Sequence, residues 1–437
     1  MKNKFIKSTI LLIIGGIITK ILAMVLKIFL TRIIGNKGIG LYMLIMPTFT
    51  LFITISTMSL PTSISKVISE GKSSKKVILS LLPITIIYNI FIMLFLYLLS
   101  PLIANNLLKN PDTILPIKAI CFTLPFIAIS SILKGYFYGK VRMLPYVISN
   151  VTEQIVRLTI IIIFIPKLIS YGINIAVFGV VIVNIISEFI SIIILLLFIP
   201  NKHIDISFLK PDKIILKDIL NISLNTTGSR FIGSISYFLE PIILTFILLK
   251  CGYSTAYITN EYGIITGYVF PLLLLPSFFS SAISTTILPI LSKSIANNNL
   301  VYTKKKLTEA IILSLIIGLF FTILFILFPE IILKLIYNTD KGVNYIRIIS
   351  PLFLLLYIQT PLTSYMQAAN MANKAMKGTF YSAIIKNIVL LITPIFIGIW
   401  GLIIANITNI FIVTIHHIYY VKKSLKTESK ISVNLIE

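Results

Sequence analysis

Residues 174–217 read NIAVFGVVIVNIISEFISIIILLLFIPNKHIDISFLKPDKIILK, and this stretch decides the class of fold. Its first part, residues 174–199, is an apolar run long enough to cross the roughly 30 Å hydrocarbon core of a membrane as a helix. Its second part carries four lysines between Lys202 and Lys217, interleaved with apolar residues. That pattern is typical of a segment lying on the anionic inner leaflet. A membrane span followed by a basic cytoplasmic segment is therefore predicted.

The same alternation of apolar runs and basic gaps extends along the whole chain. Hydrophobic residues make up 57% of the sequence and charged residues 12%. Runs of this length and composition predict an all-α polytopic membrane protein with about twelve transmembrane helices. The predicted spans lie near residues 8–34, 41–65, 77–99, 114–136, 145–165, 174–199, 218–249, 262–290, 308–328, 345–368, 378–397 and 400–420.

The basic residues predict how these spans are oriented. The chain has 38 lysines and arginines and a formal net charge of +24, which would favour nucleic acid as a partner in a soluble protein. Here about 24 of them fall in the N-terminus, the C-terminal tail and every second gap, Lys134 in the fourth gap among them, against about six in the opposite gaps. By the positive-inside rule, both termini are predicted to be cytoplasmic, and no nucleic-acid partner is expected.

The two halves of the chain are expected to be parallel repeats. Three residue pairs coincide at an offset of 228: Pro61 with Pro289, Pro101 with Pro329, and Asp112 with Asp340. Six spans separate the copies, so both halves have the same orientation, a plan found in many transporters. The predicted parts are an N-terminal six-helix lobe (1–200), a basic amphipathic connector (201–217), a C-terminal six-helix lobe (218–421) and a cytoplasmic tail (422–437).

Three cations within spans predict a site for an anion. Lys20 and Lys27 are seven residues apart, so they share one face of the first span, which contains no acidic residue. Arg230 lies on the first span of the second half. A charge near the bilayer centre costs about 2.5–3.5 kcal/mol on insertion scales, so such residues usually face a cavity or a partner. The alternative is that the lysines snorkel to the interface or line passive water.

Acidic residues within spans are fewer. Glu153 and Arg157 are spaced i, i+4 on span 5 and predict a helical ion pair, with a structural or a gating role. Glu188 on span 6 has no obvious partner nearby in the sequence.

A second acidic residue suggests ion coupling. Glu240 precedes Pro241, which frees backbone carbonyls in the helix, so the pair could bind a proton or Na⁺. Asn387 and Asn406 could complete that site. The alternative is that Glu240 is simply buried beside Arg230 or a neighbouring helix.

Neither metal nor nucleotide chemistry is indicated. Cys121 and Cys251 have no metal-ligand spacing, and the chain has no phosphate-binding Gly-rich loop with lysine. We therefore expect no catalytic residue, no metal and no cofactor other than a coupling Na⁺ or H⁺.

Four motifs resemble a known family. They are GNKGIGLY (Gly35–Tyr42), SLPTSISKVISE (Ser59–Glu70), GYFYGK (Gly135–Lys140) and EQIVR (Glu153–Arg157). These resemble the stage V sporulation protein B group of polysaccharide flippases, in the multidrug/oligosaccharidyl-lipid/polysaccharide (MOP, MATE-like) exporter superfamily, and the match is dense over roughly residues 5–160. Members of that group usually have fourteen helices, so the groove formed by the two extra helices is expected to be absent here.

The resemblance implies a fold, a cargo and a location. It implies two six-helix lobes that alternate between inward- and outward-open states in a bacterial cell membrane. It also implies an undecaprenyl-pyrophosphate-linked sugar as cargo, whose pyrophosphate is the anion for Lys20, Lys27 and Arg230. The expected partners are this lipid-linked sugar and membrane lipids, with the protein as a monomer.

Other functions stay open at this point. A cation-coupled multidrug exporter of the same superfamily would favour carboxylates in the cleft, whereas the first span has lysines. A membrane glycosyltransferase or polymerase would typically carry acidic or histidine groups on a large external loop, and the predicted outer loops are short. A scaffold without transport activity is the third alternative.

Overall fold

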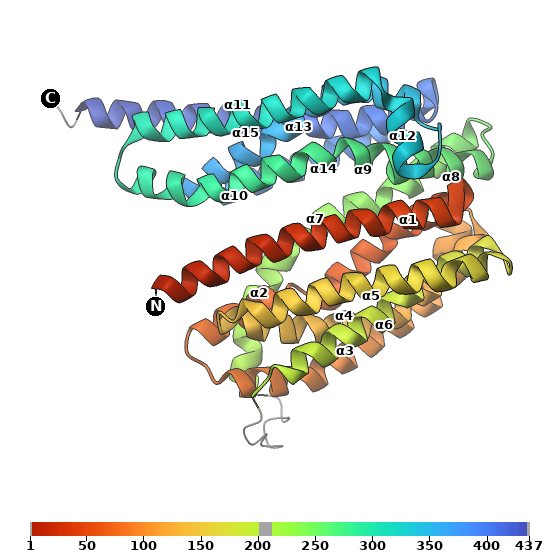
Figure 1. The fold of residues 1–437 in the computed structure, drawn as a ribbon, viewed down its shortest axis with the longest axis horizontal. Coiled ribbons are helices and arrows are strands. Elements are labelled where there is room, and N and C mark those ends of the chain that lie inside the picture. The colour runs from red at the N-terminus through yellow and green to blue at the C-terminus, as the bar shows by residue number, and fades with distance from the viewer. Residues whose placement is uncertain (1, 201–211, 435–437) are drawn as a thin grey trace. The chain divides into compact units, whose positions relative to one another are not determined.

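The computed structural model describes residues 2–200 and 212–434, and it contains only helices, turns and short connections in those ranges. The chain divides into two compact units, Met1–Ile242 and Ile243–Glu437. Within each unit, long helices run side by side (Figure 1). Most of the predicted connector, residues 201–211, and the last three residues of the predicted tail lie outside the described residues.

The bounds of the helices are as follows. Unit 1 contains α1 (Lys2–Thr57), α2 (Leu60–Ser69), α3 (Ser74–Leu102), the π-helix η1 (Ile103–Leu107), the 3-10 helix η2 (Pro111–Thr113), α4 (Ile114–Gly139), α5 (Met143–Ile169), α6 (Ile173–Leu197) and most of α7 (Lys213–Lys250). Unit 2 contains the end of α7, then α8 (Thr255–Gly263), the π-helix η4 (Ile264–Val269), α9 (Phe270–Leu273), α10 (Leu275–Ala296), α11 (Leu300–Leu327), α12 (Pro329–Tyr337), α13 (Val343–Ala368), α14 (Ala372–Ile397) and α15 (Trp400–Asn434).

The helices agree with the predicted spans. Ten helices in the described ranges are long and apolar enough to cross a membrane, and each overlaps one of the last ten predicted spans. The first predicted span falls on the first arm of α1, which bends at Gly35, and the second predicted span covers the second arm and the start of α2. The all-α polytopic fold is therefore confirmed, while the cytoplasmic location of the termini and the parallel relation of the halves stay predictions.

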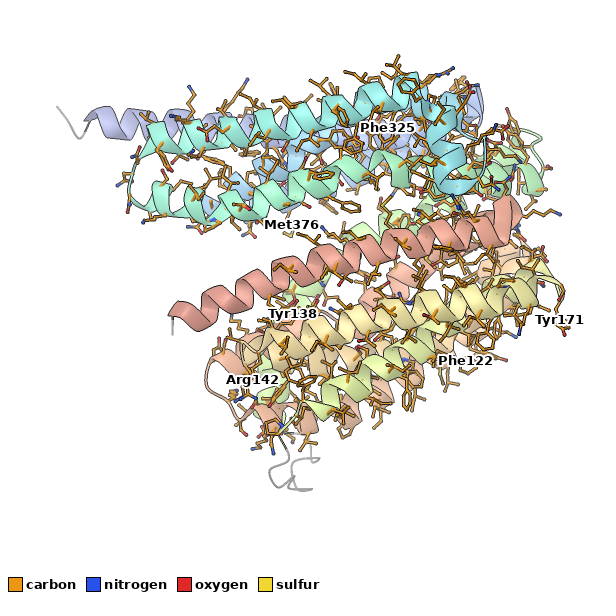
Figure 2. All side chains as sticks on the ribbon, in the orientation of Figure 1. Phe122, Tyr138, Arg142, Tyr171, Phe325 and Met376 are labelled. Carbon is orange, nitrogen blue, oxygen red and sulfur yellow. The ribbon has the colours of Figure 1, made fainter. Side chains whose placement is uncertain are left out.

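Large apolar side chains cover the outer faces of these helices, as expected for contact with lipid. The side chains of Phe122 on α4 and Met376 on α14 are each 43% exposed (Figure 2). In water such surfaces would be costly, because apolar area is stabilised by removal from water. Ten membrane-length helices with lipid-like outer faces make this a multi-pass membrane protein.

Two of the predicted spans are not single unbroken helices. The span predicted at 41–65 is interrupted at Met58 and Ser59, which have positive φ, and α2 then begins with Pro61 in its first turn. The span predicted at 262–290 contains the π-helix η4 and is divided at Leu274, before α10 begins. Hydropathy reports only the length of an apolar run. It does not detect a break in the helix, which a proline favours because it lacks the N–H group that continues the backbone hydrogen bonds.

The boundary between the units falls inside α7, after Pro241, and the reason is packing. Ile215 and Ile219 in the first part of α7 join a buried apolar cluster that includes residues of α2, α3, α4 and α6. Asp218 pairs with Lys72, and Lys76 Nζ lies 2.6 Å from Asp212 Oδ2. The hydrogen bond from Lys76, together with the backbone N–H groups of two following residues, lowers the pKa of Asp212. Most of α7 thus packs as part of unit 1.

The bend of α1 depends on a single glycine. Gly35 has φ 64° and ψ −171°, a combination that residues with a Cβ essentially do not adopt. No other atom lies within 4 Å of a Cβ placed there, so the cost of a side chain would come from the backbone alone. Gly35 therefore lets α1 bend between the first two predicted spans.

We expect Gly35→Ala to destabilise the protein by roughly 1–3 kcal/mol, the cost of holding alanine in a glycine-only conformation. The measurement is SDS-driven unfolding of the purified protein in mixed micelles. Gly228→Ala is the matched control, because Gly228 lies in open space within α7, has no positive φ and should gain helix propensity. Equal stability of the two variants would show that the bend does not require glycine.

Candidate functional site

The three predicted anion-binding cations all lie in unit 1. Lys20 is exposed and Lys27 half-buried on the first arm of α1, and Arg230 is exposed on α7. Lys20 and Lys27 have mainly apolar neighbours in α1, whereas Arg230 follows the polar stretch Asn225–Ser229 of α7. Their role as binding residues stays a prediction, which the proposed function below takes up.

The predicted ion-coupling residues are divided between the units. Glu240 on α7 is 2% exposed and directly precedes Pro241, as the sequence indicated. Asn387 on α14 and Asn406 on α15 belong to unit 2, and the Asn406 side-chain amide donates to the Leu402 carbonyl within its own helix. The coupling role of these residues likewise stays a prediction.

A buried network of four charged side chains lies between α4, α5 and α6. Arg157 Nη2 is 2.8 Å from Glu153 Oε1, so the side chains expected to pair by their i, i+4 spacing do so. Lys134 Nζ is 3.2 Å from the other oxygen of Glu153 and 3.8 Å from Glu188 Oε2. Arg157 also donates through Nε to the Ser187 hydroxyl, at 3.3 Å. Glu153 therefore joins both cations, and Lys134 joins both carboxylates.

The charges of this network balance, which is what its burial requires. The side chains of Lys134, Glu153, Arg157 and Glu188 are 16%, 8%, 18% and 9% exposed. Charges in an apolar interior cost several kcal/mol each unless they are paired and hydrogen-bonded. Glu153 meets that condition through its contacts with both cations, whereas Glu188 Oε2 accepts no hydrogen bond from the described residues and only pairs with Lys134 at 3.8 Å. Together the two cations and two carboxylates join three membrane-length helices.

The sequence placed one member of this network wrongly and left another without a partner. Lys134 was expected in a cytoplasmic gap, but it lies within α4, which continues to Gly139. Glu188 pairs with it from α6. The signal in the sequence was Glu188 itself, an acidic residue within a span, because such a residue needs a cation from another helix.

Unit 2 has a buried polar core of a different kind. Lys386 on α14 is 7% exposed, and His417 on α15 is 3% exposed. Gln359 on α13 donates to the Thr414 hydroxyl and to the Ile410 carbonyl, both at 2.8 Å. His417 lies in the part of α15 that is long and apolar enough to cross a membrane. Interhelical hydrogen bonds of this kind are common in membrane helix packing.

Comparison with protein families gives two overlapping matches. The family described as Polysaccharide biosynthesis protein matches residues 5–295, and the MatE family matches residues 262–393. Stage V sporulation protein B of Bacillus subtilis (strain 168) is 34% identical to this chain, covering 98% of the chain and 86% of that protein. Lipid II flippase MurJ of the same organism is 22% identical, covering 88% of the chain and 76% of that protein.

Solved structures agree on the fold. An inward-facing multidrug resistance MATE family transporter of the MOP superfamily superposes with a TM-score of 0.76 at 15% identity, covering 94% of this chain and 96% of that one. An outward-facing transporter of the same description gives a TM-score of 0.61 at 14% identity, with coverage of 98% and 96%. At these identities the similarity identifies the fold as MATE-like and says nothing of the substrate.

Proposed function

This chain belongs to the polysaccharide biosynthesis protein family, and we propose that it is a flippase for an undecaprenyl-pyrophosphate-linked sugar, which it moves from the inner to the outer leaflet of the bacterial cell membrane. The sugar is a precursor of a cell-wall or spore polysaccharide. Relatives named as a sporulation protein and as a lipid II flippase support membrane transport of a lipid-linked substrate. The protein acts as a carrier with alternating access and forms no covalent intermediate with its cargo.

The observation that carries this proposal is the position of the cations in unit 1. Lys20 and Lys27 lie on one face of α1, and neither is fully buried, so a ligand can reach them. Arg230 on α7 is exposed as well. Lysine and arginine form strong charge-assisted hydrogen bonds with phosphate oxygens. A pyrophosphate headgroup matches these residues, whereas a cationic drug would be repelled by them.

The test of the cargo is depletion of the protein in its own cell. We expect a lipid-linked sugar to accumulate on the cytoplasmic face, and its identity names the substrate. In vesicles, the purified protein should make that lipid accessible from the opposite leaflet while leaving a cationic dye such as ethidium untransported. Transport of the dye without flipping of the lipid would replace this proposal with the multidrug-exporter hypothesis.

We propose that Glu240 takes part in coupling to H⁺ or Na⁺, and Glu240→Gln should then remove the dependence of flipping on pH or Na⁺. The reason is that an amide resembles the protonated carboxyl group and carries no charge for a cation. The measurement is the initial rate of flipping in vesicles across a series of pH values and Na⁺ concentrations.

The matched control for this substitution is Glu330→Gln. Glu330 lies at the start of α12, where its side chain is 65% exposed beside Arg347. This variant should keep the dependence of the wild type. An unchanged dependence in Glu240→Gln would remove Glu240 from the coupling mechanism.

A further inference from the structure

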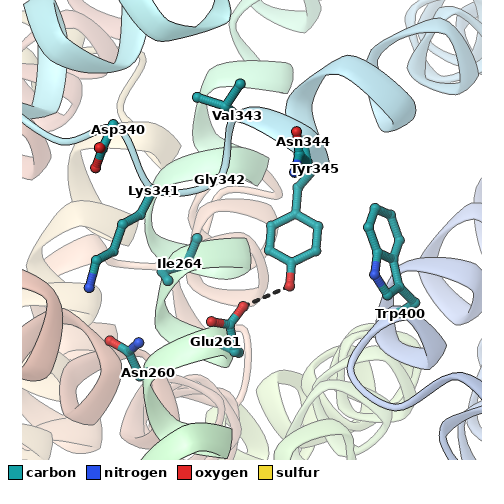
Figure 3. A pocket seen from close by; sticks show the side chains of 10 residues that line it. All are labelled: Asn260, Glu261, Ile264, Asp340, Lys341, Gly342, Val343, Asn344, Tyr345 and Trp400. Atoms are coloured by element: carbon teal, nitrogen blue, oxygen red, sulfur yellow. Dashed lines mark hydrogen bonds between the residues drawn. The ribbon is translucent and has the colours of Figure 1, made fainter.

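A pocket in unit 2 has no assigned role. It has a volume of about 440 Å³ and is lined by residues of α8 and η4, by the turn before α13 and the first residues of α13, and by the first residue of α15 (Figure 3). Sites for small ligands have typical volumes of about 300–1,000 Å³, so the pocket is large enough for a small organic molecule. All its lining residues belong to unit 2.

One wall of the pocket is aromatic. The rings of Tyr345 and Trp400 meet edge to face, with centroids 4.9 Å apart and an interplanar angle of 62°. Both side chains are partly exposed to the pocket, and Trp400 is the only tryptophan of the chain. Figure 3 shows the two rings side by side above Glu261. Aromatic rings of this kind present an apolar surface next to polar groups.

The rest of the pocket lining is largely polar, and the carboxylate of Glu261 is held in place. The Tyr345 hydroxyl donates to Glu261 Oε2 at 2.7 Å, shown as the dashed line in Figure 3. A carboxylate can accept about four hydrogen bonds, so Glu261 keeps capacity for the hydroxyl groups of a ligand. The amides of Asn260 and Asn344 add both donors and acceptors.

The charge of the pocket distinguishes between ligand classes. Glu261 and Asp340 carry two negative charges and Lys341 carries one positive charge. This balance disfavours a phosphate, in contrast to the cations of unit 1. A sugar ring has hydroxyl groups that donate and accept hydrogen bonds, and C–H faces that pack on aromatic rings. The pocket combines the groups that such a ligand requires.

We propose that this pocket is a binding site for a neutral sugar, with its C–H face against Trp400 and Tyr345 and its hydroxyl groups bonded to Glu261, Asn260 and Asn344. The pocket lies at the end of unit 2 that holds the turns before α13 and α15. Lys293, Lys304 and Lys374 mark the opposite end, which the positive-inside rule places in the cytoplasm. By that rule the sugar would meet the pocket on the outer side of the membrane.

The link of this pocket to transport rests on the proposed function, but the binding of sugar does not. The bound sugar could be the headgroup of the transported lipid or a separate saccharide outside the cell. Both have the same ring chemistry, so the experiment first measures sugar binding alone and then compares flipping.

The fluorescence of Trp400 reports directly on the pocket, because no other tryptophan contributes. Glucose and N-acetylglucosamine are titrated into the purified full-length protein in detergent. We expect a saturable change with half-saturation in the millimolar range for at least one of them, and no saturable change with the open-chain alditol sorbitol or with inorganic phosphate. No saturable change with either sugar, or an equal change with sorbitol, would overturn the proposal.

Two variants test the named residues, and a third serves as the control. Glu261→Leu and Asn344→Ala should each weaken sugar binding at least ten-fold, and Asn344→Ala keeps the Tyr345–Glu261 hydrogen bond should Glu261→Leu fail to fold. Glu309→Gln should leave the titration unchanged, since Glu309 pairs with Lys306 on α11 and does not line the pocket. If both pocket variants bind sugar as tightly as the wild-type protein does, the proposal is contradicted.

The flipping assay then identifies the source of the sugar. Slower flipping in Asn344→Ala, together with weaker sugar binding, indicates that the pocket receives the headgroup of the transported lipid. Normal flipping with weaker binding indicates a separate saccharide as the ligand. If the wild-type protein binds sugar but flips no lipid-linked sugar, the proposed transport function fails while the sugar site stands.

Discussion

Replacing Lys20 and Lys27 together by alanine should abolish flipping in reconstituted vesicles while leaving the amount and folding of the protein intact. Charge-assisted hydrogen bonds contribute about 1.5–3 kcal/mol each, which corresponds to a loss of roughly ten-fold to a hundred-fold for each lysine. Lys20 is exposed and Lys27 half-buried, so truncation removes charge without opening a large cavity in the core. The measurement is the initial rate at which a pyrophosphate-linked lipid becomes accessible from the opposite leaflet.

Two double variants show whether the effect is specific. Lys20→Arg with Lys27→Arg keeps both charges and should retain most of the activity. Lys422→Ala with Lys423→Ala removes the same charge from an exposed part of α15 and should flip at the normal rate. Unchanged flipping in the Lys20 and Lys27 alanine variant, or equal loss in the Lys422 and Lys423 variant, would contradict an anion site on α1.

Replacing Glu153 by glutamine should produce the largest loss of stability, about 3–5 kcal/mol. Glu153 bonds to Arg157 at 2.8 Å and to Lys134 at 3.2 Å, and its side chain is 8% exposed. Without its charge, two buried cations face the single carboxylate of Glu188, whose contact with Lys134 is 3.8 Å. The measurement is SDS-driven unfolding in mixed micelles, with size-exclusion profiles to compare the folded fraction.

A second substitution tests whether charge balance is the cause. Lys134→Met combined with Glu153→Gln leaves one cation and one carboxylate, so the double variant should recover part of the stability lost in Glu153→Gln. Glu309→Gln removes a carboxylate whose side chain is 42% exposed and should have little effect on stability. Additive losses for Lys134→Met and Glu153→Gln would show that the two side chains are not coupled.

The predicted spans were accurate because hydropathy is a local property. An apolar run such as residues 174–199 crosses a membrane whatever its neighbours are, since each backbone group can be satisfied within its own helix. The structure accordingly has α6 at Ile173–Leu197. The breaks at Ser59 and Leu274 were missed, because the apolar character of a run continues through a change in backbone conformation.

Contacts between candidate residues could likewise be predicted within one helix but not between separate helices. Glu153 and Arg157 were predicted to pair because i, i+4 spacing places both side chains on one helix face. Lys134 and Glu188 lie on two other helices, at positions whose proximity depends on how α4, α5 and α6 pack. Nor does any spacing relate Glu261 to Tyr345 and Trp400, which three separate segments bring to one pocket.

The sequence by itself therefore determined the class of protein, the positions of most spans, the family and the cations of α1. Each of these follows from composition, or from residues close together in the chain. Only the tertiary structure decided which charges neutralise one another and which polar groups share a pocket. The physical reason is that a buried charge needs a partner within about 4 Å, and between separate helices only packing sets that distance.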